Sequence, residues 1–232
     1  MSTLKTGALR GTSGTAATMT LHASDGSVEI PKLKVGSDAA GDVLYHNGTN
    51  YVRLAKGTDG QVLTLSGGVP TWASGGITVA DQWRVNSNFD TASLDPVSSN
   101  WERVDHASQG TIGSTMAVSS GIWTFPSTGV YQVTLVTTYK AAGNVERRYV
   151  EALILGTTNN SSYDAIAVST QGLGGDGTGD NYGNLTASSL VDVTDTSNVN
   201  IKFKLTAQDT TTFVGHTENN AFYATFIRLG DT

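Results

Sequence analysis

The stretch of residues 121–136, GIWTFPSTGVYQVTLV, constrains the fold more than any other part of the chain. Trp123 and Phe125 are two residues apart, so both side chains lie on one face of an extended segment. Residues 126–129 have turn chemistry, because proline fixes φ and glycine accepts a positive φ. Apolar and polar residues then alternate from Tyr131 to Leu135, as they do in a half-buried strand. The stretch predicts a β-hairpin around which a two-layer β-sandwich can be built.

The composition of the 232-residue chain favours strands and turns over helices. Glycine is abundant, at 27 residues, whereas proline accounts for only 4 residues and charged side chains for only 15%. Apolar residues nowhere recur over a long stretch at the three- and four-residue spacing of an amphipathic helix. We therefore expect an all-β protein with very little helix.

Strand patterns separated by turn residues recur through the second part of the chain. Outside the central hairpin, the predicted strands are residues 83–85, 101–104, 116–119, 148–155, 165–168, 187–193, 199–205 and 221–230. Asp95 and Pro96 lie in a predicted loop, and a second loop, rich in glycine and aspartate, is predicted at residues 172–184. Strands this numerous, spaced by turns, indicate a sandwich or a barrel.

Two of these stretches resemble a known family. Residues 123–133, WTFPSTGVYQV, resemble the signature of the C1q/TNF-like jelly rolls, in which an aromatic residue, a proline–glycine turn and a Gly-x-Tyr-x-apolar strand follow one another. Residues 221–230, AFYATFIRLG, resemble the closing strand of that family. The resemblance covers roughly the last two-thirds of the chain. It implies a jelly-roll sandwich that assembles as a homotrimer about a threefold axis.

The last predicted strand needs a covering surface on both sides. In residues 201–205 apolar residues alternate with lysine, which leaves one face in water, but residues 222–227 carry aromatic or branched side chains on both faces. We expect one face to line the sandwich core and the other to face neighbouring chains of the trimer, with a covering loop of the same chain as the alternative. The residues assigned to core and trimer packing are Tyr131, Phe222, Tyr223, Phe226 and Ile227.

Residues 41–73 form a second distinctive block. Asn47 and Gly48 stand between two short apolar runs, which is a strong hairpin signal. The block resembles the G-D-[VI]-L-Y-x-N-G…P-x-W module of bacteriophage tail fibres and other virion appendages, and the opening residues resemble the N-termini of small phage fibre-like proteins. We predict three parts: an attachment segment (1–40) and a β-hairpin module (41–75), which together make a slender β-rich stem, and a C1q/TNF-like jelly roll (76–232).

Charge and targeting patterns exclude several classes of protein. The formal net charge is −6 and the sequence pI is about 5.0, which argues against a general nucleic-acid binder. Cysteine is absent, so neither disulfides nor thiolate metal sites are expected. The sequence has no apolar run long enough to span a membrane, and its opening residues lack the apolar core of a signal peptide. We expect assembly in a host cytoplasm and a final location in the virion.

A search for catalytic and metal-binding patterns gives little. None of the four histidines (His22, His46, His106 and His216) has a second ligand at metal-binding spacing. Asp176 and Asp180, in the glycine-rich loop, are the candidate cation ligands, but the loop lacks the ligand order of an EF-hand and turn duty explains both residues. No catalytic triad, nucleophile elbow or phosphate loop is present. We predict no cofactor and no enzymatic activity.

The sequence therefore supports a structural and adhesive role. Tyr163 and Tyr182 lie among Ser, Asn, Gly and Asp, a composition typical of adaptable contact surfaces, so they are the candidate receptor contacts. The main hypothesis is a homotrimeric fibre or spike of a phage particle, anchored to other virion proteins through its N-terminal part and contacting a host surface glycan or protein. The alternatives are a capsid decoration protein or head fibre without a receptor, and, with least support, a polysaccharide depolymerase.

Overall fold

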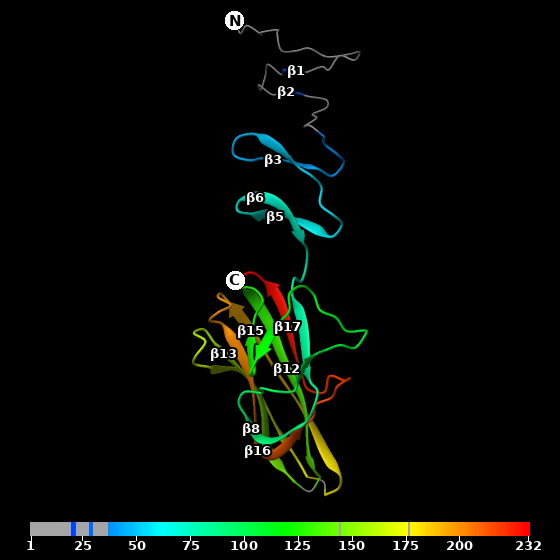
Figure 1. Cartoon of the computed structure of the whole chain (residues 1–232), viewed down its shortest axis with the longest axis vertical. Helices are drawn as coiled ribbons and strands as arrows, with labels where there is room; N and C mark the ends of the chain where they lie inside the picture. The colour runs from blue at the N-terminus through cyan, green and yellow to red at the C-terminus, as the bar shows by residue number, and fades with distance from the viewer. Residues whose placement is uncertain (1–19, 22–27, 30–36, 144, 176) are drawn as a thin grey trace. The chain divides into compact units, whose positions relative to one another are not determined.

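The computed structural model describes residues 20–21, 28–29, 37–143, 145–175 and 177–232. Within these residues the protein contains strands and turns but no helix, which confirms the all-β prediction (Figure 1). The chain divides into two compact units, the first ending at Gly75 and the second running from Gly76 to Thr232. Most of the predicted attachment segment, residues 1–40, lies outside the described residues.

Seventeen strands are described. The first unit holds β1 (Thr20–Leu21), β2 (Val28–Glu29), β3 (Val43–His46), β4 (Tyr51–Leu54), β5 (Gln61–Ser66) and β6 (Val69–Ser74). The second unit holds β7 (Ala80–Val85), β8 (Phe89–Leu94), β9 (Trp101–Arg103), β10 (Ala117–Ser119), β11 (Ile122–Thr124), β12 (Gly129–Ala142), β13 (Arg147–Thr157), β14 (Asp164–Leu173), β15 (Asp180–Val193), β16 (Asn200–Phe213) and β17 (Tyr223–Gly230).

The second unit is a sandwich of two antiparallel layers. One layer has the order β15–β12–β17–β7–β9, and the other places β14, β13 and β16 side by side with β8 and β11–β10 beyond β16 (Figure 1). The layers join at one end, where Tyr139 and Lys140 of β12 pair with Phe213 and Thr212 of β16. The sandwich is therefore one curled sheet, which leaves fewer open edges than two separate sheets would.

The predicted hairpin at residues 121–136 is wrong in its pairing. The turn is present, but β11 pairs with β10 and β16, whereas β12 pairs with β15 and β17. The chain thus crosses from one layer to the other at this turn, and Phe125 meets Tyr131 across the core with ring centroids 4.8 Å apart. Alternation along the sequence fixes which face of each strand is apolar, but not which strand becomes its neighbour.

Trp123 lies at the centre of the core. It is fully buried, and its ring lies 4.9–5.7 Å, centroid to centroid, from four other aromatic rings, three from the layer that contains β7, β9 and β17 and one from β16 of the other layer. These partners are Trp83, Trp101, Phe203 and Phe226. These five aromatic residues therefore meet in one cluster, built from strands up to about 140 residues apart in the chain.

Two strand predictions need correction. The predicted loop at residues 172–184 is shorter, because β14 continues to Leu173 and β15 begins at Asp180. Strand β8 was not predicted, since its residues do not alternate cleanly between apolar and polar. It pairs with β16 in two separate pieces, and the register shifts between Thr206 and Thr211.

Gly183 gives a direct test of how closely β15 packs on the core. Gly183 pairs with Tyr139 of β12, and the fully buried tyrosine ring lies over the glycine. A Cβ added to Gly183 would lie 2.3 Å from Cζ of this ring. We expect Gly183→Ala to lower the free energy of unfolding by about 1–3 kcal/mol, because the ring has no free space to move into. A matched control, Gly174→Ala, meets no atom within 4 Å and should change stability by less than about 0.5 kcal/mol. Equal urea midpoints for the two variants would contradict this packing.

The first unit contains two hairpins with matching entry turns. β3 pairs with β4 and β5 pairs with β6. Before the first hairpin, the Asp42 side chain accepts the N–H of Ala39, and before the second the Gln61 side chain accepts the N–H of Thr58. Gly41 and Gly60 take the equivalent position in each turn, with φ of +90° and +85°. The two hairpins are therefore variants of one structural repeat.

The Asp42 carboxylate makes the first hairpin sensitive to acid. Its hydrogen bonds to the Arg53 side chain and to the N–H groups of Ala39 and Lys56 lower its pKa from 3.8 to about 2. A group whose pKa falls on folding adds stability above its ordinary pKa, and this stability is lost as the pH drops towards the folded value. We expect the protection of the Ala39 and Lys56 amides against hydrogen exchange, relative to their intrinsic exchange rates at each pH, to fall between pH 4 and pH 2. In the Asp42→Asn variant this pH dependence should be absent. If the variant showed the same pH dependence as the unmodified protein, the role of the carboxylate would be contradicted.

Candidate functional site

The outward face of the layer β15–β12–β17–β7 is a candidate interaction surface. The strand registers place its side chains in three rows that run across the strands. The first row is Leu190, Gln132, Ile227 and Ala80; the second is Ser188, Thr134, Thr225 and Gln82; the third is Thr186, Val136, Tyr223 and Arg84. We call these three rows the row face. Its outer rows carry apolar side chains, and its middle row is entirely polar.

Hydrogen bonds hold the middle row of the row face in place. The Gln82 amide donates to Thr225 Oγ1 at 2.8 Å and accepts from Asn220 Nδ2 at 2.6 Å, while the Thr134 and Ser188 hydroxyls are 3.0 Å apart. Oδ1 of Asn220 is buried and has no hydrogen-bond partner within the described structure. Such a row is rigid and suits a partner that brings its own hydrogen-bonding groups.

At the flank of the row face, Arg84 is fully buried. Its Nε donates to Glu102 Oε1 at 2.7 Å, and a second nitrogen donates to Asp105. The guanidinium charge is therefore neutralised within the chain by two carboxylates. A partner surface against the row face would not have to supply a counter-ion for Arg84.

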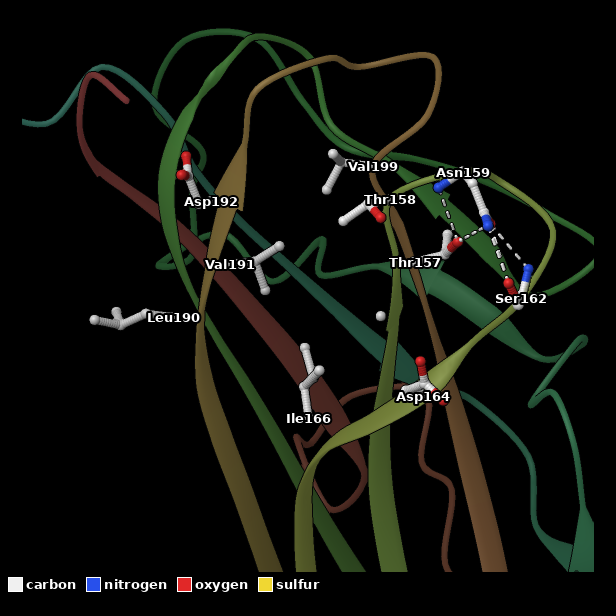
Figure 2. Close-up of a pocket in the computed structure, with 11 residues that line it drawn as sticks. Thr157, Thr158, Asn159, Ser162, Asp164, Ile166, Leu190, Val191, Asp192 and Val199 are labelled. Atoms are coloured by element: carbon white, nitrogen blue, oxygen red, sulfur yellow. Dashed lines mark hydrogen bonds between the residues drawn. The ribbon is translucent and has the colours of Figure 1, made fainter.

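Next to the row face lies an open pocket of about 410 Å³ between β14 and β15 (Figure 2). Its floor is formed by Gly156, Ile166, Val191 and Val199, while Leu190 points away from the floor and is 64% exposed (Figure 2). Ile166 is 41% exposed. Together Leu190 and Ile166 give this edge of the sandwich an apolar surface, which we call the β14–β15 edge.

The walls of the pocket are polar. On one side a small loop is fixed by Asn159 Oδ1, which accepts hydrogen bonds from Thr157 Oγ1 at 2.9 Å and from Ser162 N at 3.0 Å (Figure 2). Asp164 and Asp192 stand at opposite ends of the pocket (Figure 2). Among the described residues no group of three His, Cys, Asp or Glu side chains could hold a metal ion.

The two tyrosines predicted as receptor contacts lie near opposite ends of the sandwich. Tyr163 packs against Lys202 near the start of β16, with Nζ 5.0 Å from the ring centroid. Tyr182 lies opposite Lys140, which pairs with Thr212 near the end of β16. Ten residues of strand separate Lys202 from Thr212, on the order of 30 Å. One binding site cannot include both tyrosines of the same chain.

The surroundings of the two tyrosines also differ. Tyr163 is half-buried, and burial raises the pKa of its hydroxyl more than nearby Lys202 lowers it. Lys202 also pairs with Asp95 at 2.7 Å, so this tyrosine belongs to a cluster that ties the loops to β16. Tyr182 is 59% exposed and remains available for contact. Its role as a receptor contact stays a prediction.

Of the two candidate cation ligands, only Asp180 lies among the described residues. Asp180 forms an ion pair with Lys140 at 2.7 Å, and this hydrogen bond raises the pKa of the lysine. Asp176 lies outside the described residues. A carboxylate that is already neutralised by a lysine is a poor cation ligand. The ion pair instead gives Asp180 a structural role, because it holds the start of β15 to β12.

The residues predicted for core and trimer packing divide between the two sides of the sheet. Tyr131, Phe222 and Phe226 are fully buried in the core, whereas Tyr223 and Ile227 are half-buried on the row face. Sequence reasoning missed Leu190 and Ile166. The alternating pattern of β15 could have identified Leu190, which is the one large aliphatic residue at an outward position of that strand. Ile166 could not have been identified in this way. It is displaced by a bulge in the pairing of β13 with β14, beside Leu155, and no residue pattern in the sequence marks that bulge.

Comparison with known proteins gives matches among solved structures. The Eiger TNF of S. frugiperda is 14% identical, with a TM-score of 0.51, and the match covers 66% of this chain and 94% of that chain. Murine APRIL, solved at pH 5.0, is 10% identical, with a TM-score of 0.47 and coverage of 65% and 98%. No family model and no curated protein matches the sequence. The sandwich is a TNF-like jelly roll. The fold implied by the sequence resemblance is thus confirmed.

Among the described residues, no helix is long and apolar enough to cross a membrane.

Proposed function

We propose that this chain is a homotrimeric structural protein of a bacteriophage particle, acting as a short fibre or spike that contacts the host surface. The observation that carries the trimer is the pair of unlike apolar surfaces on the jelly roll, namely the row face around Tyr223 and Ile227 and the β14–β15 edge at Leu190 and Ile166. The phage origin rests on the resemblance of residues 41–73 to a virion-appendage module.

Two unlike surfaces on one chain favour a closed ring. If the edge of one copy covers the row face of the next, the contact is heterologous, and it ends only when the ring closes. A ring of three leaves no apolar surface of either kind uncovered. A twofold dimer formed by the row face alone would leave Ile166 exposed at its rim.

Trimerisation also gives the fibre its adhesive strength. A single exposed loop or tyrosine binds weakly, but three copies per trimer and many trimers per particle turn modest affinity into avidity. Tyr182 is the described aromatic residue that we would place in such a contact, because it is exposed near the start of β15, after the loop that follows β14. The first unit would attach the trimer to other virion proteins.

The same trimer suits a second role, as a capsid decoration protein or head fibre with no receptor. The observation that favours this role is that Tyr163, one of the two predicted receptor contacts, packs against Lys202, which itself pairs with Asp95. Particles lacking the protein separate the two roles. Lost adsorption with sturdy heads indicates a tail fibre, whereas fragile heads with normal adsorption indicate a decoration protein.

Mass photometry of the full chain at submicromolar to micromolar concentration tests the trimer. We expect a species of three times 24.2 kDa. A stable monomer across this range would overturn the proposal. Immuno-electron microscopy of the particle with an antibody against the jelly roll then gives its position, and absence from the particle would overturn the virion role.

A further inference from the structure

We infer that a pocket on the outward face of the layer that contains β16 binds one neutral sugar unit of a glycan. This inference rests on the proposed contact with the host surface, and it names the ligand class and the place of that contact. The pocket has a volume of about 370 Å³ and lies where β10 and β11 meet the start of β16. Volumes of about 300–1,000 Å³ are usual for sites that take small molecules.

The lining of this pocket is polar but uncharged. Among the described residues that line it, only Ile122 is apolar. The others bring a hydroxyl or an amide group: Ser119, Thr124, Thr196, Ser197, Asn160 and Asn200. These groups donate and accept hydrogen bonds, as the hydroxyls of a sugar do, but none of them could neutralise an ionic ligand. The lining therefore favours a neutral polyhydroxylated ligand over a charged one, and over a peptide segment held by large apolar anchors.

Asn200 gives the pocket an unsatisfied polar group. Ile201 and Phe203 lie in the core, so the alternation along β16 turns Asn200 to the outward face, where it is only 3% exposed. Its Oδ1 is buried and accepts no hydrogen bond within the described structure. The hydroxyl of Thr157, which pairs with Asn200, is already donated to Asn159. A half-turn about the last side-chain torsion exchanges Oδ1 and Nδ2, so the Asn200 amide can offer an acceptor or donors to a sugar hydroxyl.

Hydrogen bonds fix the two loops that form the walls. The N–H of Asn160 donates to the carbonyl of Asn198 at 3.0 Å, which ties the loop after β13 to the turn before β16. Within that turn, Asp195 accepts the N–H of Ser197 at 2.8 Å and Nδ2 of Asn198 at 2.6 Å. The Tyr163 hydroxyl lies 3.5 Å from Oδ1 of Asn160, so this tyrosine is a positioning residue for the wall. A pocket formed before the ligand arrives lowers the entropy cost of binding.

The proposed ring leaves this pocket open. It lies on the layer of β16, whereas the row face is the outward side of the other layer. None of the described residues that line it lines the pocket between β14 and β15. Each trimer therefore carries three copies of the pocket. Single sugar units that bind with a Kd in about the millimolar range then give avidity on a surface that displays many of them.

Saturation-transfer difference NMR of the full chain tests the pocket with free sugars as probes. The neutral probes are glucose, galactose, mannose and N-acetylglucosamine, and glucuronic acid is the charged counterpart of glucose. Thr124→Trp fills the pocket from the residue that pairs with Asn200, and Thr210→Trp, the matched control, places the same ring at an exposed position near the other end of β16. We expect at least one neutral sugar to bind the unmodified chain and the control equally, and to bind Thr124→Trp at least about tenfold more weakly.

A second variant tests the buried amide. Asn200→Ala removes the amide and keeps the backbone pairing with β11 and β13. We expect the Kd of the neutral sugar to rise about fivefold to tenfold, because one hydrogen bond to the ligand is lost. The circular dichroism spectrum should stay unchanged. A lower urea midpoint with an unchanged Kd would mean that Asn200 has only a structural role, and would overturn its part in the site.

The outcomes separate this inference from the proposed trimer. If no probe is saturated, the ligand belongs to another class, such as a protein, and the sugar pocket is overturned. It is also overturned if Thr124→Trp and Thr210→Trp bind the sugar equally, or if glucuronic acid binds as well as glucose. In each case a trimer seen by mass photometry still stands. If the chain is a monomer and only Thr124→Trp loses the sugar, the trimer fails and the pocket stands.

Discussion

Replacing Trp123 with alanine is expected to lower the free energy of unfolding of the jelly roll by about 3–5 kcal/mol, the range for deleting a fully buried large aromatic side chain. Trp123 has no exposed surface, and its ring contacts aromatic rings from both layers. Its loss leaves a cavity between strands that cannot collapse together, because the layers are joined into one curled sheet. Urea denaturation at fixed protein concentration, followed by circular dichroism, measures the effect.

Trp123→Phe is the matched control. The indole Nε1 of Trp123 is buried and has no hydrogen-bond partner within the described structure, so its removal leaves no new polar group unsatisfied. Phenylalanine keeps an aromatic ring against Phe203 and Phe226. We expect a loss of less than about 2 kcal/mol, since only part of the ring volume is removed. A loss as large as that of the alanine variant would mean that the indole makes a specific contact that the structure does not contain.

Replacing Ile227 with glutamate should convert the proposed trimer into a folded monomer. Ile227 is half-buried on the row face, between Gln132 and Ala80, and its side chain points away from the core. A glutamate there would be buried without a counter-ion in each of three contacts, at a cost of about 3 kcal/mol or more per contact. Summed over the ring, this exceeds a millionfold in assembly. Mass photometry should show monomers at micromolar concentration.

A control on the opposite layer separates assembly from folding. Leu153 is half-buried on the outward side of β13, opposite Lys204 of β16. Leu153→Glu should remain trimeric, and in Ile227→Glu the circular dichroism of the jelly roll should match that of the unmodified protein. A trimeric Ile227→Glu variant would show that the row face does not form the assembly surface.

Much of the architecture could be read from local patterns. The period of two in residues 131–135 predicted the strand that became the start of β12, and the aromatic residues expected in the core are buried or packed against it. The Asn–Gly turn predicted the β3–β4 hairpin. These features follow from short-range rules: alternation assigns faces, and turn residues set where a strand ends.

Other features depend on contacts between distant segments. Strand β8 pairs with β16 on both sides of a register shift. Residues 180–184 form part of strand β15 because β12 offers them backbone hydrogen-bond partners along its whole length. Contacts with distant segments also separate Tyr163 from Tyr182, which look alike in the sequence. Tyr163 is a half-buried packing residue in the structure, whereas Tyr182 is exposed. The character of their neighbouring residues is similar, so no local rule could separate them.

The sequence alone determined that this chain forms strands, where most of them end, and which side chains seek a core, because these properties depend on residues within a few positions of one another. The tertiary structure decided that the stretch around Trp123 crosses between layers and that Leu190 shares the row face with Ile227. Pairing and coverage are decided by competition among strands over the whole chain, and a local pattern does not contain the result of that competition.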